Sequence, residues 1–427
     1  MMRSSLLRRQ HAGVIRVDEF LLGAPPVGVE PIGGRGAAPV APSKGVLAGD
    51  RVTVDIAVGQ RGDALDPSEL SWQTLHTVRA VSWQRGGSGV GLPHPSSIVV
   101  EADASAGSLD VLGGGVSMSD PVRIRLDNTA NAALQPLAWG HVTSARSQFQ
   151  WPSVASVSLR AVDGLRMLAR RPLAADVPSN TVSVMVHAVL DQAGWPAARR
   201  VVQDSVRRGV ALVAGGGTCL DAINDLTRAE GPTASRWVGN DGRFRWRARR
   251  ALTSRARSVT PAATFSALQA SDAARWAALH VGLDDVDVYP RAEVTDDGSG
   301  VVYVAEDAAQ VIAVGPLTQR YNARYTLPAD GRVDADLLVA LHAHSAPQVR
   351  TLVVRPVADD AAFAALAALD IGDRVRCEIV APHNLTDVHT IDSHIRAIGW
   401  DVQPGAQCAV TLTLSPAAPY DMLGGAW

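Results

Sequence analysis

Two stretches of the chain, 253 residues apart (374 minus 121), carry the same alternation of apolar and polar residues. The first, residues 121–163, reads PVRIRLDNTANAALQPLAWGHVTSARSQFQWPSVASVSLRAVD. The second, residues 374–416, reads RVRCEIVAPHNLTDVHTIDSHIRAIGWDVQPGAQCAVTLTLSP. Side chains of a strand point alternately to its two faces, so this period of two is typical of half-buried strands. We therefore expect three strands in each stretch, and a fold built around two such β units.

The offset of 253 aligns all three strands without a gap. A one-residue slip within a strand would move every side chain to the opposite face, so the shared phase favours a duplicated β unit. The alternative is that two unrelated antiparallel units look alike. A fourth strand, SIVV from Ser97 and TLVV from Thr351, needs an offset of 254. The aligned pairs are Val122 with Val375, Ile124 with Cys377, Leu126 with Ile379, His141 with His394, Val157 with Val410, Leu159 with Leu412 and Ala161 with Leu414.

The character of the sequence changes along the chain and divides it into five segments. The Gly-, Pro- and Ala-rich start lacks periodicity, while short alternating runs separated by turn residues predict a barrel or sandwich. The expected fold class is mainly β, with two β-barrel or sandwich modules separated by a helix-containing insert. The segments are an extended N-terminal arm (1–50), a first β module (51–163), a small α+β domain (164–250), a mixed β/α connecting domain (251–350) and a second β module with a C-terminal tail (351–427).

The α+β segment contains two helices and a hairpin. Thr218 and Asp221 form a capping-box pair at the start of one helix. Asn240-Asp241-Gly242 between apolar residues predicts a β-hairpin. The apolar positions at helical spacing are Val182, Val186, Val189 and Leu190 in the first helix, and Leu220, Ile223 and Leu226 in the second, which Gly231 ends.

The composition excludes several classes of protein. The formal net charge of −2 at pH 7 points to neither a nucleic acid nor an anionic membrane. Three cysteines are too few for a disulfide framework, and no apolar run approaches the ~18 residues of a membrane span. The N-terminus lacks the apolar region of a signal peptide, so we expect synthesis in the cytoplasm and no stable membrane insertion. Lys44 is the only lysine, which indicates a GC-rich, actinobacterial type of genome.

No motif predicts a catalytic, cofactor-binding or metal-binding residue, and no cofactor is expected. Gly215-Gly216-Gly217 precedes a capped helix but lacks the lysine of a phosphate-binding loop. His342 and His344 do not share a face of their predicted helix, which argues against zinc. We interpret His141 and His394 as half-buried strand residues rather than as ligands.

An arginine-rich stretch, residues 243–257, is the strongest local charge feature. It begins with alternating arginine and aromatic residues, which predict a strand with one apolar and one basic face. The basic face could contact DNA phosphates. A solvated or intersubunit face that pairs with acidic neighbours is the favoured alternative. The alternating residues are Arg243, Phe244, Arg245, Trp246 and Arg247.

With its helical segment between two β units, the chain resembles the baseplate hub, or tail-tip, proteins of long-tailed phages. Residues 121–170 are similar to the hub's opening module, in which Asp163-Gly164-Leu165 starts a helix. LDAINDLTRAEGPTASRWVGNDGRFRWRAR resembles the family's helix and hairpin. Residues 369–416 look like the C-terminal module of actinobacteriophage minor tail proteins. The resemblance covers about residues 50–420.

This resemblance implies a structural virion protein without enzymatic activity. Its β units would be tail-tube-like modules, and a homotrimer would present six of them to a sixfold tube ring. The implied place is the phage tail tip, where the hub joins the tail tube to the tip complex. The implied partners are a distal tail or tail-tube ring protein, the tape-measure protein and other minor tail proteins, with phage DNA in transit.

Two other functions stay open. One is a tail-tip cell-wall hydrolase, and the other is a carbohydrate-binding protein that recognises the host surface. Stacking on sugars needs exposed aromatic side chains, and the chain has ten tryptophans. Those in predicted strands are mostly in phase with the core, which predicts burial: Trp72, Trp83, Trp139, Trp151 and Trp246.

Overall fold

The computed structural model describes most of the chain from residue 52 onward, within the unit Lys44–Trp427. The predicted N-terminal arm, residues 1–50, lies outside the described residues. These are 52–59, 70–76, 78–86, 94–103, 109, 111, 115–128, 133–150, 154–266, 274–282, 288–344, 347–356, 360–381, 384–403 and 407–423.

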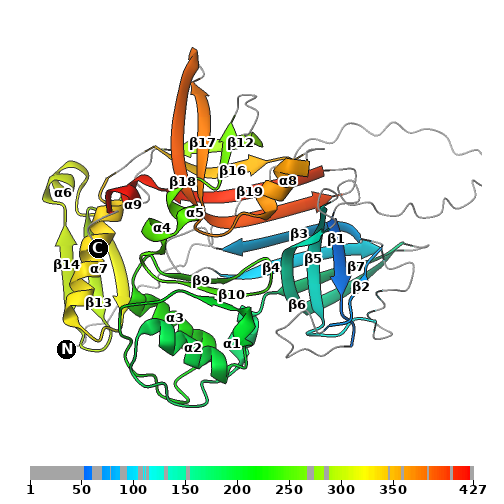
Figure 1. The fold of residues 1–427 in the computed structure, drawn as a ribbon, viewed down its shortest axis with the longest axis horizontal. Helices are drawn as coiled ribbons and strands as arrows, with labels where there is room; N and C mark the ends of the chain where they lie inside the picture. The colour runs from blue at the N-terminus through cyan, green and yellow to red at the C-terminus, as the bar shows by residue number, and fades with distance from the viewer. Residues whose placement is uncertain are drawn as a thin grey trace, which may run out of the picture. The chain divides into compact units, whose positions relative to one another are not determined.

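The first group of strands forms one half of a large sheet (Figure 1). Its members are β1 (Val52–Ile56), β2 (Gln73–Thr74), β3 (Val78–Gly86), β4 (His94–Asp103), β5 (Pro121–Asn128), β6 (Ala133–Gln150) and β7 (Val154–Val162). They are hydrogen-bonded in the order β2-β1-β5-β6-β7-β4-β3. The alternating runs of the sequence therefore form the predicted strands, with apolar residues on the core side.

The second group closes into a six-stranded barrel within the described residues. It contains β11 (Ala263–Ser266), β12 (Ala274–Gly282), β16 (Gln348–Val354), β17 (Arg374–Ala381), β18 (Asn384–Gln403) and β19 (Gln407–Pro416). The order β17-β11-β12-β16-β19-β18 returns to its start because β18 also pairs with β17. Strand β18 pairs with β3 as well, so both groups belong to one continuous sheet of 13 described strands.

Both groups follow one strand order. The order β1-β5-β6-β7-β4-β3 in the first corresponds to β11-β17-β18-β19-β16-β12 in the second. They differ in one polarity, since β1 is antiparallel to β5 whereas β11 is parallel to β17. They also differ in closure, because β11 pairs with β12 while the described parts of β1 and β3 do not pair.

The register of the strand pairs agrees with the offset of 253. A β-bulge also interrupts the β6–β7 and β18–β19 pairs at equivalent places, directly after Val142 and Ile395. A bulge is a specific feature of one position in a strand, so its recurrence adds to the agreement of phase. The equivalent pairs are Pro121–His141 with Arg374–His394, and Val142–Ala161 with Ile395–Leu414.

The fourth strand aligns differently from the prediction. Val100 in β4 lies opposite Leu159, and Leu352 in β16 lies opposite Leu412. Val100 and Leu352 are thus equivalent, and their numbers differ by 252 instead of the predicted 254. A shift of two residues leaves the same faces buried, so alternation alone could not distinguish the two alignments.

Turns of the same build precede β5 and β17. In each, a residue with positive φ is followed by a buried aspartate whose carboxylate accepts a hydrogen bond from the backbone N–H three residues earlier. Ser119 has a φ of 75° and Gly372 one of 74°, a region that favours glycine. The hydrogen bonds run from Ser117 N to Asp120 (2.6 Å) and from Asp370 N to Asp373 (2.9 Å). The agreement between the two strand groups therefore extends upstream of β5 and β17.

The α+β segment has a core of its own. Its elements are α1 (Leu165–Arg170), α2 (Val182–Gln192), η2 (Ala197–Arg199), β8 (Arg200–Val202), α3 (Cys219–Glu230), β9 (Ser235–Val238) and β10 (Phe244–Arg247). Two short helices, α4 (Ala251–Ser254) and α5 (Ala256–Val259), follow in the predicted connecting segment. The capping box of Thr218 and Asp221 and the β9–β10 hairpin are confirmed. Ile223 and Leu226 are buried, but Leu220 is only half-buried because it lies at the edge of the stripe.

A smaller unit occupies residues 288–344. It contains β13 (Arg291–Asp296), β14 (Val302–Glu306), α6 (Ala308–Val314), β15 (Thr318–Ala323) and α7 (Pro328–His342), and its three strands form a separate sheet. The remaining helices of the described residues are α8 (Asp360–Ala367) and α9 (Ala418–Leu423). None of the described helices is both long and apolar enough to span a membrane.

The barrel draws on two of the predicted segments. Its strands β11 and β12 come from the predicted connecting domain, 251–350, and the others from the last segment, 351–427, apart from the start of β16. The burial pattern of β12 does not mark it as a barrel strand, because its described side chains are half-buried or exposed. The boundaries of the five predicted segments remain a prediction of how the chain divides.

Candidate functional site: a polar sheet face and an arginine–aspartate cluster

Strands β16, β19, β18, β3 and β4 are consecutive neighbours across the junction of the two strand groups. On one side, their alternate residues are apolar and buried. On the other side, the alternate residues are small or polar, and we call this surface the polar sheet face. It consists of Ser82, Gln84, Ser97, Val99, Thr351, Val353, Gly399, Asp401, Ala409, Thr411 and Thr413.

The polar sheet face crosses the junction without a break. Gln84 lies opposite both Ser97 in β4 and Gly399 in β18, and Gly399 lies opposite Thr411 in β19. A hollow of about 320 Å³ is lined largely by these residues. Seven of the eleven residues of this surface have a hydroxyl, amide or carboxylate side chain, so it contains no large apolar patch.

Two tryptophans fix the junction from the core side. Trp83 in β3 lies opposite Trp400 in β18, and their rings stack with centroids 5.2 Å apart and an interplanar angle of 9°. Both side chains are buried. Such pairs contribute about 0.5–1.5 kcal/mol beyond the area that they bury, so the stack helps to hold the two strand groups in register.

The tryptophans predicted to be buried do not form an exposed platform in the described part of the chain. Trp83, Trp139 and Trp246 are buried. Trp72 is half-buried, and the Arg123 guanidinium lies 4.2 Å from its ring centroid. Trp151 lies outside the described residues.

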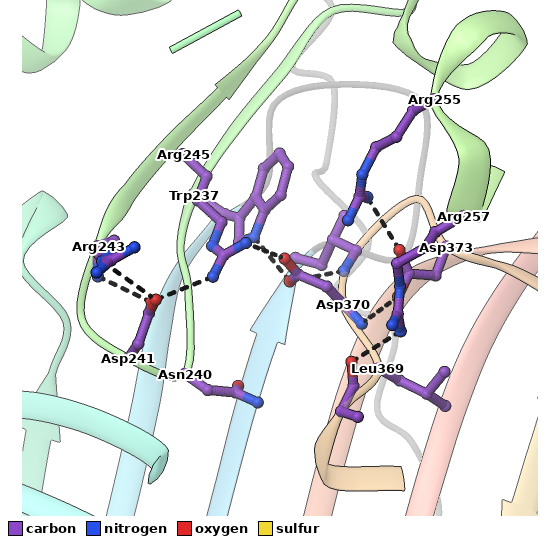
Figure 2. Close-up of polar contacts among 12 residues, drawn as sticks. Trp237, Asn240, Asp241, Arg243, Arg245, Arg255, Arg257, Leu369, Asp370 and Asp373 are labelled. Carbon is purple, nitrogen blue, oxygen red and sulfur yellow. Dashed lines mark hydrogen bonds and ion pairs between the residues drawn. The ribbon is translucent and has the colours of Figure 1, made fainter. Parts of the chain in front are cut away.

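The arginine-rich stretch meets the turn before β17 in a second polar site, the arginine–aspartate cluster (Figure 2). The hairpin turn places Asp241 next to β10, and α4 and α5 follow β10 in the chain. The turn at residues 369–373 lies opposite β10 and the helices. The cluster consists of Arg85, Asp241, Arg245, Arg247, Arg255, Arg257, Asp370 and Asp373.

Asp370 is held by groups from three strands, β3, β9 and β10. Arg85 donates to its Oδ1 at 3.1 Å, and the Trp237 indole N–H donates to the same oxygen at 2.9 Å. Arg245 lies 3.1 Å from Oδ2 and also donates to Asp241 at 3.1 Å. Burial alone would raise the pKa of Asp370, but the nearby arginines outweigh it and the pKa is lowered.

Asp373 binds Arg255 and Arg257. Arg255 donates to Oδ1 at 2.9 Å, and Arg257 donates to Oδ2 at 2.7 Å (Figure 2). Arg257 also donates to the carbonyl of Ala368 at 2.8 Å. These contacts attach α5 and the segment before it to the turn that the repeat shares with residues 117–120.

The prediction of a basic face on β10 is only partly correct. Phe244 and Trp246 are buried as expected, and Arg243 is half-exposed. Arg247, however, is buried, with its guanidinium 4.3 Å from the ring centroid of Trp237. Burial lowers the pKa of Arg247 to about 10. The face is covered because neighbouring β9 and the turn at 369–373 pack against it, which local alternation does not reveal.

The histidines singled out in the sequence lie in different surroundings. His141 and His394 are both buried, more fully than predicted, and His394 Nε2 is 2.8 Å from the carbonyl oxygen of Ser258. Burial lowers the pKa of His394 to about 4, so this side chain is neutral at pH 7. His344 is exposed, 3.5 Å from Asp307. Among the described residues, no group of three His, Cys, Asp or Glu side chains could hold a metal ion.

Comparison with known proteins gives similarity in structure only. No family model matches the sequence, and no curated protein sequence matches it. A tail protein from Neisseria meningitidis MC58 is similar, with a TM-score of 0.56 over 85% of this chain and 96% of its own, at 13% identity. The prophage MuSo2 43 kDa tail protein from Shewanella oneidensis has a TM-score of 0.55, covering 87% and 98% at 9% identity.

A third similar structure is a PdpA–VgrG complex, with a TM-score of 0.51 over 86% of this chain and 65% of that one, at 9% identity. At these identities the likeness concerns the fold. The chain thus has the mainly β fold of phage tail proteins, including a six-stranded barrel.

Proposed function

We propose that the protein is a baseplate hub, a minor tail protein at the tail tip of a long-tailed actinobacteriophage. Its role is structural: it joins the tail tube to the tip complex. The fold that it shares with tail proteins supports this assignment. Its location is then the virion, after synthesis in the host cytoplasm.

One observation carries the proposal: two strand groups of the same order and register lie in one continuous sheet. We interpret them as two tail-tube-like modules of one chain. Three chains around an axis then present six modules, which match a sixfold tube ring although the hub itself is a homotrimer. Strand pairing between β3 and β18 already joins the two modules within a chain, so the same edge contact offers a pattern for joining neighbouring chains.

The polar sheet face is the surface that we assign to the channel. It spans both modules through the row Ser97, Gln84, Gly399 and Thr411. Small hydroxyl side chains and a glycine make few strong contacts with a passing chain. Such a lining lets the tape-measure protein and then DNA move through without being retained.

The partners that follow are the distal tail or tail-tube ring protein on one side and other tail-tip proteins on the other. The tape-measure protein and phage DNA pass through the centre. The predicted segments keep their roles in this proposal, with 51–163 and 351–427 contributing to the modules and 164–250 and 251–350 providing the insert. The burial of Trp83, Trp139 and Trp246 gives no support to carbohydrate binding.

Deleting the gene in the phage that encodes this chain tests the assignment. Without a hub to start tube assembly, lysates should contain filled heads without full-length tails when imaged by negative-stain electron microscopy. A plasmid copy of the wild-type gene should restore the tails, which controls for effects on neighbouring genes. Normal full-length tails in the deletion strain, or finding this protein only in heads, would refute the proposal.

A further inference from the structure

A pocket of about 300 Å³ opens at the arginine–aspartate cluster. It lies where the β9–β10 turn, the segment before α5 and the turn after α8 meet, next to the start of β6. Its charged lining consists of Arg85, Asp241, Arg245, Arg255, Arg257 and Asp370. Arginine is therefore the dominant side chain of the pocket, and the polar sheet face contributes none of its lining.

The cluster around this pocket has more positive than negative groups. Five arginines, Arg85, Arg245, Arg247, Arg255 and Arg257, stand against three aspartates, Asp241, Asp370 and Asp373, a surplus of two positive charges. Like charges gathered in a partly buried, low-dielectric site repel one another more strongly than in water. Burial also lowers the pKa of both Arg85 and Arg247. An anion in the pocket would relieve this repulsion.

Two hydrogen-bond donors of residues that line the pocket have no partner among the described residues. The Nε atoms of Arg85 and Arg245 are buried and have no hydrogen-bond partner among the described residues. Arg85 is only 4% exposed, so water has little access to it. Buried donors without partners are costly and uncommon in folded proteins. The lining also holds two buried acceptors without a hydrogen-bond partner among the described residues, Asn240 Oδ1 and Asp370 Oδ2, so the surplus of arginines, not the unpaired atoms, favours an anion.

We propose that this pocket binds a carboxylate group from an acidic side chain of a neighbouring protein. The guanidinium groups already hold carboxylates of this chain with charge-assisted hydrogen bonds, which is the geometry that a further carboxylate requires. Carboxylate binding itself does not depend on the proposed function. Only the identification of the neighbour as a tail protein rests on it.

The shape of the site favours a protein carboxylate over the DNA backbone. Arginines that bind duplex phosphates lie on an open surface, where many of them contact the backbone in succession. Here the lining arginines are fixed by Asp370 and Asp373, and Arg257, with 42% of its side chain exposed, is the most accessible of the four. A volume of about 300 Å³ admits a side chain but not a duplex.

The test measures binding of glutarate, a small dicarboxylate, to the purified full-length protein at fixed ionic strength. Its neutral analogue glutaramide, inorganic phosphate and a short DNA duplex are measured in parallel. Glutarate should raise the midpoint of thermal unfolding with increasing concentration and give a saturating signal in calorimetry. Glutaramide should do neither, and phosphate and DNA should bind more weakly than glutarate.

Two variants locate the site, and a third controls for charge. Arg257→Gln should weaken glutarate binding by about tenfold or more, because it removes a charge-assisted contact. Gln135→Glu adds a negative charge to the half-buried lining without removing a bond of the cluster, and should weaken binding similarly. Arg228→Gln is the matched control, since its side chain is 50% exposed, pairs with Asp225 on the same helix and does not line the pocket. It should leave the affinity for glutarate unchanged.

Several results would overturn the inference. These are no effect of glutarate on the wild type, equal effects of glutarate and glutaramide, or the same affinity in Arg257→Gln and Gln135→Glu as in the wild type. Tighter binding of phosphate or the DNA duplex, sensitive to the same two variants, would assign the pocket to nucleic acid instead. None of these outcomes bears on the tail-deletion experiment, so failure of the pocket and failure of the hub assignment are distinguishable.

Discussion

Replacing Asp334 by alanine is expected to lower the free energy of unfolding by about 3–5 kcal/mol, because it leaves a buried arginine without its main partner. Asp334 on α7 is fully buried and accepts two hydrogen bonds from Arg207, at 2.7 and 2.8 Å. The Tyr325 hydroxyl donates to it at 2.9 Å. Arg207 belongs to the α+β segment, so this pair ties that segment to the 288–344 unit.

The matched control lies on the same helix. Asp336 forms an exposed ion pair with Arg332, four residues before it in sequence. Asp336→Ala should cost less than about 0.5 kcal/mol, because exposed pairs of this type contribute little. Both variants are compared with the wild type by urea unfolding at pH 7, followed by circular dichroism. Equal midpoints for the two variants would show that the Arg207–Asp334 pair does not hold the two parts together.

Replacing Trp400 by alanine should cost about 3–5 kcal/mol, the usual range for a buried tryptophan in a packed core. Trp400 is buried, stacks on Trp83, and has the Phe363 ring 6.2 Å away. The change removes the contact that fixes β3 against β18. We therefore expect the midpoint of thermal unfolding to fall by several degrees in scanning calorimetry.

Val388→Ala is the control for Trp400, since Val388 lies on the same strand and is 41% exposed. It should change the midpoint only slightly. If Trp400→Ala and Val388→Ala shift the midpoint equally, the tryptophan stack is not what stabilises the junction. In that case the rates of hydrogen exchange of the β3 amides should also be the same in both variants as in the wild type.

Local patterns were sufficient to predict many elements of this fold. The period of two predicted strands β5, β6 and β7 and their counterparts, and the capping box of Thr218 predicted the start of α3. These signals succeed because they depend on neighbours within a few residues of one another. The offset of 253 agrees with the strand register for a different reason, since equivalent bulges and turns occur in both strand groups.

Closure of the barrel could not be predicted from the sequence. It depends on β11, four residues long, pairing in parallel with both β12 and β17. Short strands and parallel pairing over a long separation leave little local signal. The turn aspartates Asp120 and Asp373 are different, because extending the offset of 253 by two residues upstream of Val122 and Val375 would have found them.

The arginine–aspartate cluster could be predicted only in part. The sequence indicated the arginines from 243 to 257, but not Arg85 or Asp370, which lie in other segments and bind each other across 285 residues. Alternation likewise predicted that Trp83 is a buried strand residue, yet only the β3–β18 register places it opposite Trp400. Contacts of this kind depend on the tertiary arrangement, which the pattern of a single strand does not contain.

We propose that each chain contributes two β modules to the wall of a phage tail channel. Cryo-electron microscopy of the tail tip from the encoding phage tests it most directly. We predict three copies of this chain around the axis, six modules in one ring, and the polar sheet face with Gln84 and Thr411 directed toward the channel. A ring of six chains with one module each at the wall, or the polar sheet face directed away from the channel, would contradict it.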